Sequence, residues 1–218
     1  MAKIDLDYIK NKLGILFLKI KQKKVIKILI FCPQRTFSNY LESFLVKNFY
    51  VEIINSTDNI KNYDNPLHKH SLITSPILKK KYNNQNYIIF LLYKNSNFWI
   101  DSLDRNDQDF FDQFLDFHNI TIKRDDKNSL IKYHKNWYET WIHNLKSFSN
   151  IEFINHRQTF NYENNLSLFH YLISKYQLVS KGKMRLPSKI RRSDTFNIIN
   201  YKKVNANVEE YSKYFKII

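Results

Sequence analysis

The sequence is poor in residues that interrupt regular structure and in residues that form covalent cross-links. Its 218 residues include two glycines, four prolines and one cysteine. So few glycines and prolines argue against a long flexible linker. An apolar content of 43% is enough to build one sizeable core. We therefore predict a single domain over residues 1–218.

The lone cysteine and the short hydrophobic runs exclude further classes. Cys32 cannot form an intramolecular disulfide, and its isolation is typical of a reducing compartment. No paired base is evident near it, so we interpret Cys32 as a small buried residue rather than a nucleophile. The apolar run Ile15–Leu18 is far too short to span a bilayer or to form a signal-peptide core. These features predict a cytoplasmic protein.

Positive charge is abundant. The formal net charge of +15 predicts affinity for anions, which include a phosphorylated cofactor, an acidic substrate, nucleic acid and an anionic membrane surface. No zinc-finger spacing or RNA-binding aromatic signature is present, so we expect no nucleic-acid partner. Basic residues gather at Lys19–Lys27, Lys79–Lys81 and Lys181–Arg192. The first group is either a solvated connector or a contact with a membrane surface.

Apolar periodicity predicts alternating helices and buried strands. The predicted strands are Val25–Phe31, Tyr50–Ile54, Asn86–Tyr93 and Ile151–Ile154. The predicted helices are Ile4–Ile20, a helix from Ser38 to Asn48, Asp107–Phe117, Leu130–Phe148, Leu166–Tyr176 and Val208–Phe215. Nearly continuous apolar strands are typical of a parallel sheet covered on both faces. We therefore predict a three-layer α/β fold with a mainly parallel central sheet flanked by helices.

The turn after the first long strand precedes a helix. A helix N-terminus has unpaired N–H groups and the positive end of the helix dipole, so it favours anions. Arg35, Thr36 and Ser38 add side-chain donors there. Asn39 and Glu42 are spaced like an N-cap and its reciprocal partner. The alternative is that these polar residues only cap the helix and that Arg35 is solvated.

This turn, Pro33-Gln34-Arg35-Thr36-Phe37-Ser38-Asn39, resembles the phosphosulfate loop of sulfotransferases that use 3′-phosphoadenosine-5′-phosphosulfate (PAPS). In that family the loop follows the first strand and wraps the 5′-phosphosulfate. The resemblance places Arg35 at the catalytic Lys, and Thr36, Ser38 and Asn39 at small hydroxyl positions. Phe37 stands where the family has Gly, which departs from the pattern because Gly lets a phosphate approach the backbone.

Two further segments resemble the same family. Lys94 follows the buried strand 86–93, and Ser102 lies eight residues later, the spacing of the family's Arg and Ser that hold the 3′-phosphate. Lys keeps the charge of that Arg but loses its bidentate fork. The segment Asn65–Leu72 resembles the element that carries the family's general base, which assigns His70 to this role with His68 as the fallback. A solvated loop and part of a metal site are the alternatives, but no Cys or acidic cluster lies nearby in the sequence to complete metal ligation.

Weaker likenesses come later in the chain. His156 falls on a family Tyr that approaches the adenine, but Arg157 and Gln158 replace the acids that follow it. Lys181, Gly182, Lys183 and Arg185 are either part of a loop over the 3′-phosphate or a solvated basic loop.

The resemblance implies a P-loop-like fold and a nucleotide-binding transferase without a required metal. The activity would be transfer of a sulfuryl group from PAPS to a hydroxyl or amine. The residues do not identify the acceptor, and a saccharide, a lipid head group and a small metabolite stay open. The alternatives are a P-loop-type nucleotide kinase or NTPase, which the missing GxxxxGK[ST] pattern disfavours, and a non-catalytic basic anion-binding relative.

Overall fold

The structure is a computed structural model, and it describes residues 6–34, 36–56, 65–71, 81–104, 108–123, 125–145, 147–156 and 162–187. Several predicted features lie wholly or partly outside these ranges. They include the catalytic candidate Arg35, most of the lysine run 79–81, Arg157 and Gln158, the end of the basic group 181–192, and the helix 208–215.

The described chain forms a parallel sheet whose strand order is β2-β1-β3-β4. Its strands are β1 (Lys27–Phe31), β2 (Glu52–Ile53), β3 (Tyr87–Tyr93) and β4 (Ile151–Asn155). β1 pairs with β2 on one side and β3 on the other, and β4 pairs with the far side of β3. Each predicted strand is confirmed, and every pairing in this sheet is parallel.

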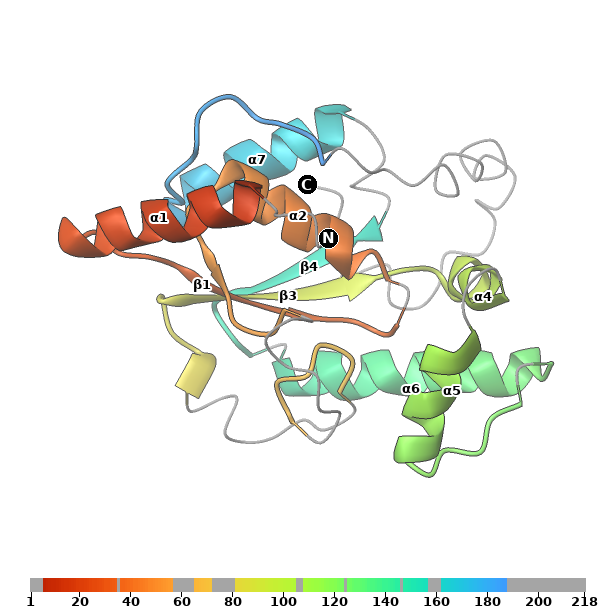
Figure 1. Ribbon diagram of the computed structural model, residues 1–218. Coiled ribbons are helices and arrows are strands. Elements are labelled where there is room, and N and C mark those ends of the chain that lie inside the picture. Colours follow the sequence, from red (N-terminus) through yellow and green to blue (C-terminus); the bar gives the residue numbers. More distant parts are fainter. Residues whose placement is uncertain are drawn as a thin grey trace.

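Helices cover both faces of the sheet (Figure 1). One layer contains α1 (Leu6–Ile20), α2 (Ser38–Asn48) and α7 (Tyr162–Tyr176), and the other contains α4 (Ser96–Asp104), α5 (Gln108–Phe117) and α6 (Lys127–Leu145). The prediction of an α/β fold with a parallel sheet between helices is therefore confirmed. α4 was not predicted; the backbone N–H of Asn97 donates to the side-chain oxygen of Asn95 (3.1 Å) at its start, as at an N-cap.

Alternate side chains of each strand point to opposite faces, which divides the core into two. Ile28 and Ile30 of β1 join the core under α2 and α7, whereas Leu29 and Phe31 join the core under α4–α6. The Phe31 ring stacks on Trp141 of α6 at a centroid distance of 4.2 Å. Tyr133, Trp137 and Trp141, which recur at helical spacing on α6, are buried in this core.

The connections on the two faces of the sheet lead toward opposite edges of it. The chain runs from β1 through α2 to β2 on one face, and from β3 through α4, α5 and α6 to β4 on the other. The topology therefore switches between β1 and β3, which are neighbours. In open α/β sheets, ligands bind outside the carboxyl ends of the strands at such a switch point.

Helix α1 packs closely against the body at Gly14. A Cβ atom built at Gly14 overlaps the Tyr50 ring. We expect Gly14→Ala to lower the free energy of unfolding by about 1–3 kcal/mol because this overlap outweighs the better helix propensity of Ala. Urea denaturation measures the change. Tyr50→Leu in the same chain should restore most of the loss, and an unchanged midpoint in Gly14→Ala would refute the close packing.

No helix in the described part of the chain is long and apolar enough to cross a membrane.

Candidate anion-binding site

The loop after β1 enters α2 through an unusual backbone conformation. Phe37 is the N-cap of α2, with φ 38° and ψ 20°, and among the described residues no side chain makes a capping hydrogen bond at this helix start. The prediction that Asn39 is the N-cap is therefore wrong. The left-handed region suits Gly best, and Gly is the residue that the family loop has at this position. The Phe37 ring lies 5.3 Å, centroid to centroid, from the ring of His156, which follows β4.

Asn39 and Glu42 both bind a buried lysine and do not cap the start of the helix. Lys69 Nζ lies 3.0 Å from Asn39 Oδ1 and 2.9 Å from Glu42 Oε1. The Lys69 side chain is only 4% exposed. A buried ammonium group needs oxygen partners. These two side chains therefore accept hydrogen bonds from Lys69 and do not form a capping box. Local sequence patterns do not indicate this pairing, because Lys69 lies 27 or more residues away.

The histidine segment lies directly against the loop. The Cys32 N–H donates to Lys69 O (2.9 Å), and His70 Nδ1 lies 2.8 Å from Cys32 O. A carbonyl only accepts hydrogen bonds, so Nδ1 carries the proton and the lone pair of neutral His70 lies on Nε2. From the other side, Trp141 Nε1 donates to Ser71 O (3.0 Å). The structure thus places the general-base candidate beside the predicted phosphate loop and fixes its tautomer.

His68 and Cys32 are uncharged at neutral pH. Burial, together with the nearby Lys69 charge, lowers the pKa of His68 to about 4. Burial raises the pKa of the Cys32 thiol to about 12. Cys32 is fully buried, as predicted. A thiol with this pKa stays protonated and is a poor nucleophile.

Lys94 lies at the carboxyl end of β3, the strand beside β1. Its backbone is held on two sides: the Lys94 N–H donates to the Tyr138 hydroxyl (3.3 Å), and His134 Nε2 donates to Lys94 O (2.8 Å). Burial lowers the pKa of His134 to about 3, so this histidine is neutral. The Tyr138 hydroxyl also donates to Leu92 O (2.7 Å). The predicted phosphate ligand Lys94 is therefore positioned at the switch point by α6.

Ser102 occupies a different setting from the one its spacing suggested. It lies within α4, and its hydroxyl donates to Trp99 O (2.6 Å) of the same helix. Trp99 itself reaches the loop, because its Nε1 donates to Gln34 O (2.7 Å). α4 therefore contacts the loop through Trp99, while the Ser102 hydroxyl is engaged by its own helix.

Thr36 and Ser38 are buried within the loop. They are 1% and 6% exposed, and the Thr36 hydroxyl lies 3.4 Å from Gln34 O. The Ser38 hydroxyl interacts with the Cys32 thiol. These hydroxyls therefore have partners inside the protein.

Gln34 is the residue that sequence reasoning missed. Gln34 is 1% exposed, and among the described residues neither its amide oxygen nor its amide nitrogen has a hydrogen-bond partner. A buried amide without partners costs about 1–3 kcal/mol. Such a cost in the middle of the loop points to a missing polar partner. No sequence pattern distinguishes this Gln from one that is exposed.

The basic segment 181–185 lies at the other end of α2. Lys181 Nζ donates to Val46 O (2.6 Å), and a guanidinium nitrogen of Arg185 donates to Lys47 O (2.8 Å). The Arg185 N–H donates to Asn48 Oδ1 (2.7 Å). Cations at a helix C-terminus are stabilised by the negative end of the dipole. The structure therefore separates this segment from the loop by the length of α2.

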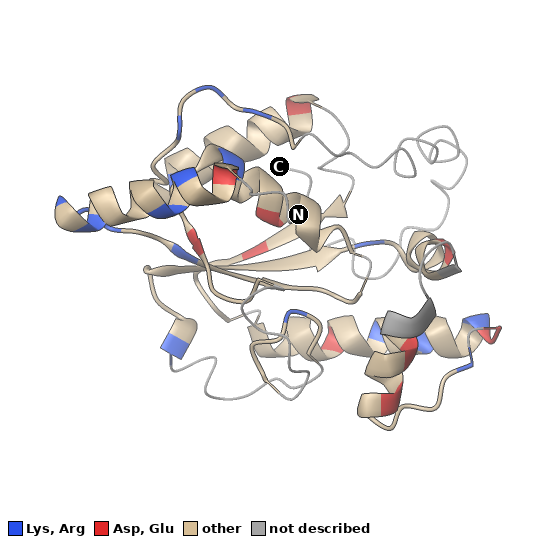
Figure 2. Ribbon diagram, in the orientation of Figure 1, with Lys and Arg blue, Asp and Glu red and all other residues tan. Residues whose placement is uncertain are grey.

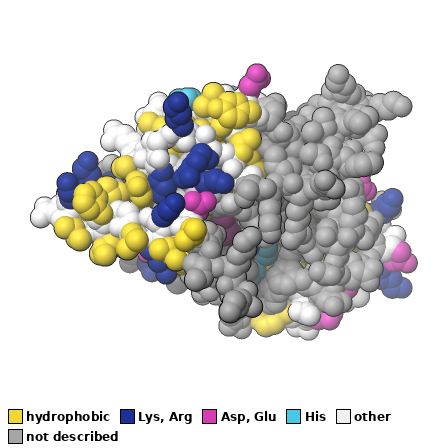
Figure 3. All heavy atoms as spheres, turned by 45° about the horizontal axis from the view of Figure 1, so that its top comes forward, with side chains coloured by type: hydrophobic (Ala, Val, Ile, Leu, Met, Phe, Trp, Pro, Cys, Tyr) yellow, Lys and Arg dark blue, Asp and Glu magenta, His cyan; other side chains and the backbone are white. Residues whose placement is uncertain are grey.

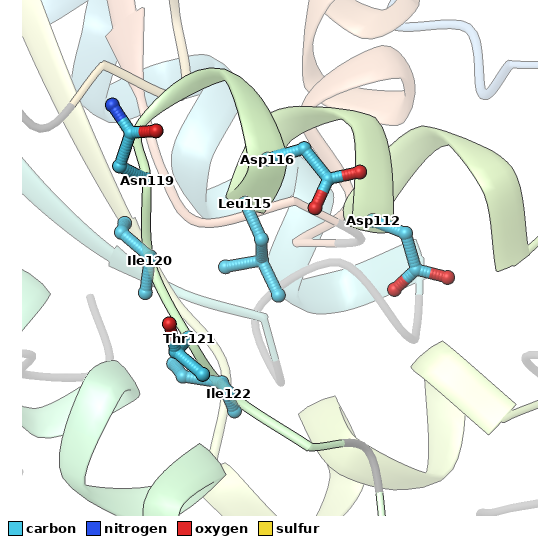
Figure 4. A pocket seen from close by; sticks show the side chains of 7 residues that line it. All are labelled: Asp112, Leu115, Asp116, Asn119, Ile120, Thr121 and Ile122. Atoms are coloured by element: carbon cyan, nitrogen blue, oxygen red, sulfur yellow. The ribbon is translucent and has the colours of Figure 1, made fainter.

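A surface hollow of about 430 Å³ lies elsewhere, on α5 and the chain that follows it (Figure 4). It is lined by Asp112, Leu115, Asp116, Asn119, Ile120, Thr121 and Ile122. None of the residues predicted for the site lines it. Within the described ranges, no three His, Cys, Asp or Glu side chains are grouped so as to hold a metal ion.

Comparison with known proteins gives no assignment: no family model matches the chain, and no curated protein or solved structure is significantly similar to it.

Proposed function

We propose that this chain is a sulfotransferase that moves a sulfuryl group from PAPS to a hydroxyl or amine. Three predicted elements support the proposal because they meet at the switch point between β1 and β3. They are the loop before α2, the segment that carries His70, and Lys94 at the end of β3. They come from three separate parts of the sequence, and a nucleotide that ends in phosphosulfate needs such groups at one place.

Each group has a role in this proposal. PAPS supplies the sulfuryl group, which leaves its 5′-phosphate as the acceptor oxygen or nitrogen bonds to sulfur. His70 accepts the acceptor's proton at Nε2. The N–H groups at the start of α2 stabilise negative charge on the departing phosphate, and Arg35 adds a fixed positive charge. Lys94 pairs with the 3′-phosphate.

The strongest support for the proposal comes from the Gln34 amide. Within the described part of the chain, its two polar atoms are buried without partners, and the start of α2 beside them has no side-chain cap. A phosphosulfate has acceptor oxygens that suit the amide nitrogen and the helix N–H groups together. This fit depends on acceptor atoms, so it also holds for other phosphorylated nucleotides.

Calorimetric titration distinguishes the candidate ligands without knowledge of the acceptor. The protein is titrated with adenosine 3′,5′-bisphosphate, with ATP and magnesium, and with adenosine 5′-monophosphate. The proposal expects selective binding of the bisphosphate. Preference for ATP with magnesium would instead assign a nucleotide kinase or NTPase, and the absence of selective binding would assign a non-catalytic basic relative.

Replacing Gln34 tests the loop itself. We expect Gln34→Leu to raise the free energy of unfolding of the ligand-free protein by about 1–3 kcal/mol because it removes an unpaired buried amide. The same change should weaken bisphosphate binding by about tenfold, since a ligand contact is lost. Urea denaturation and calorimetry measure the two effects. Gln113→Leu on the exposed face of α5 is the control and should alter neither. A Gln34→Leu protein that binds as well as the wild type would remove Gln34 from the site.

Replacing Lys94 tests the 3′-phosphate assignment. We expect Lys94→Ala to weaken binding of adenosine 3′,5′-bisphosphate by about tenfold to a hundredfold, because a charge-assisted contact is lost. Affinity for adenosine 5′-phosphosulfate, which has no 3′-phosphate, should change little. Lys132→Ala, at an exposed position of α6, is the matched control. Equal losses for both nucleotides would show that Lys94 does not select the 3′-phosphate.

A further inference from the structure

Helix α1 is attached to the body along one side only. Asn11 and Leu18 are 4% and 6% exposed, and Asn11 Nδ2 donates to Val51 O (2.8 Å). Gly14 lies between them on the same side and allows the close approach of Tyr50. With about 100° between successive residues, these three positions share one face of the helix. The opposite face of α1 therefore points away from the protein.

That opposite face is apolar. It consists of Leu6, Ile9, Leu13, Leu16, Phe17 and Ile20, whose exposed fractions range from 41% to 71%. At about 100° per residue, these six side chains fall within a stripe about 100° wide. This width is typical of the buried face of an amphipathic helix, yet here the stripe is exposed. We name it the α1 stripe.

Lysines border the α1 stripe on both sides. Lys10 and Lys21 follow one edge of it and Lys12 and Lys19 follow the other, as their spacing along the helix requires. The ammonium groups of Lys12 and Lys21 lie over the rings of Tyr8 and Phe17, 4.6 Å and 4.7 Å from the ring centroids. Figure 2 shows the Lys positions along α1, and Figure 3 shows hydrophobic and basic side chains gathered at this end of the molecule. Among residues 6–24, Asp7 is the acidic residue.

We propose that α1 is an interfacial helix that binds the surface of an anionic membrane. The exposed apolar stripe would enter the boundary between head groups and acyl chains, and the lysines on both edges would contact anionic head groups. Lysines have apolar stems and charged tips, which suits a helix that lies flat in that boundary. The charge favours anionic lipid over a second copy of this chain, since two α1 helices, each with lysines along both edges, would repel.

This inference is independent of the proposed transferase activity. The face carrying the α1 stripe lies opposite the Asn11–Leu18 face that packs on the protein. The candidate anion site is built from the loop before α2, the segment 68–71 and the end of β3. Failure of nucleotide binding would therefore leave the lipid proposal standing, and the reverse also holds.

Vesicle co-sedimentation tests the proposal with the full chain. Vesicles of phosphatidylcholine with about one third phosphatidylserine should bind the protein, and pure phosphatidylcholine should bind it about tenfold or more weakly. Raising the salt from about 0.1 M to about 1 M should reduce binding to the anionic vesicles, because charge screening shortens from roughly 10 Å to 3 Å. Equal binding to both vesicle types, or no binding to either, would overturn the proposal.

Two variants separate the apolar and the electrostatic contributions. Leu13→Glu with Phe17→Glu should lower partitioning by about a hundredfold, since two large apolar side chains no longer enter the lipid. Lys12→Gln with Lys21→Gln should lower it by about tenfold to thirtyfold. The matched controls lie on the opposite face of the sheet: Phe117→Glu with Ile131→Glu, and Lys127→Gln with Lys132→Gln. Both controls should bind as the wild type does.

The same variants test the competing explanation, which is that the α1 stripe forms an interface between two copies of the chain. If the wild type self-associates without lipid and Leu13→Glu with Phe17→Glu makes it monomeric, the α1 stripe belongs to an interface between copies and the lipid proposal is wrong. Circular dichroism of each variant confirms that it is folded before it is tested. Unchanged vesicle binding by a folded Leu13→Glu, Phe17→Glu protein would also overturn the proposal.

Discussion

His70→Asn is expected to lower the rate of sulfuryl transfer by a factor of about 10² to 10⁴ while affinity for adenosine 3′,5′-bisphosphate changes little. The amide nitrogen of Asn can take the place of His70 Nδ1 and keep the hydrogen bond to Cys32 O, which is 2.8 Å in the wild type. No base then stands at the position of Nε2. Transfer to a panel of hydroxyl and amine acceptors gives the rate, and calorimetry gives the affinity.

Two comparisons make this result specific to the base. His70→Ala should lose the same activity and also about 1–3 kcal/mol of unfolding free energy, because the Cys32 carbonyl loses its donor. His143→Asn, on the exposed face of α6, should change neither quantity. A His70→Asn enzyme as active as the wild type would exclude His70 as the base and leave His68 to be tested in the same way.

Glu42→Ala is expected to lower the free energy of unfolding by about 3–5 kcal/mol. The change removes the carboxylate that lies 2.9 Å from Lys69 Nζ, and the Lys69 side chain is only 4% exposed. Its positive charge would then stay buried with less compensation. Urea denaturation at neutral pH measures the loss.

The chain contains a matched pair at the surface. Lys135 and Glu139 lie 3.7 Å apart on α6, with side chains 50% and 48% exposed. Glu139→Ala should therefore cost less than about 1 kcal/mol, since water solvates the remaining lysine. Lys69→Met combined with Glu42→Leu should recover most of the stability lost in Glu42→Ala, because both buried charges are gone. Similar losses for Glu42→Ala and Glu139→Ala would mean that the Lys69 pair is solvated.

Much of the fold was predictable because its signals are local. The β-branched run before Phe31 and the run before Lys94 each indicated a strand buried on both faces, and both are confirmed. The helices with clear apolar spacing were also found, with ends displaced by a few residues. α4 was overlooked because its residues were interpreted through the spacing from Lys94 to Ser102.

The order of the site along the chain was predictable, but its contacts were not. Sequence alone put the loop, the histidines and Lys94 next to consecutive strands, and parallel strands bring such positions to one edge. It did not show that Asn39 and Glu42 bind Lys69, because that pairing joins side chains 27 or more residues apart. The capping prediction failed for this reason.

Composition and apolar periodicity were enough to predict the α/β architecture, an affinity for anions from the net charge of +15, and a helix over residues 4–20. The contacts between distant groups became clear only in the folded chain. The fold set the tautomer of His70 through Cys32 O, left the Gln34 amide buried without partners among the described residues, and turned the apolar stripe of α1 outward. Periodicity and composition record how a segment divides into apolar and polar faces. Which face is covered, and by what, depends on residues distant in sequence that only the folded chain brings together.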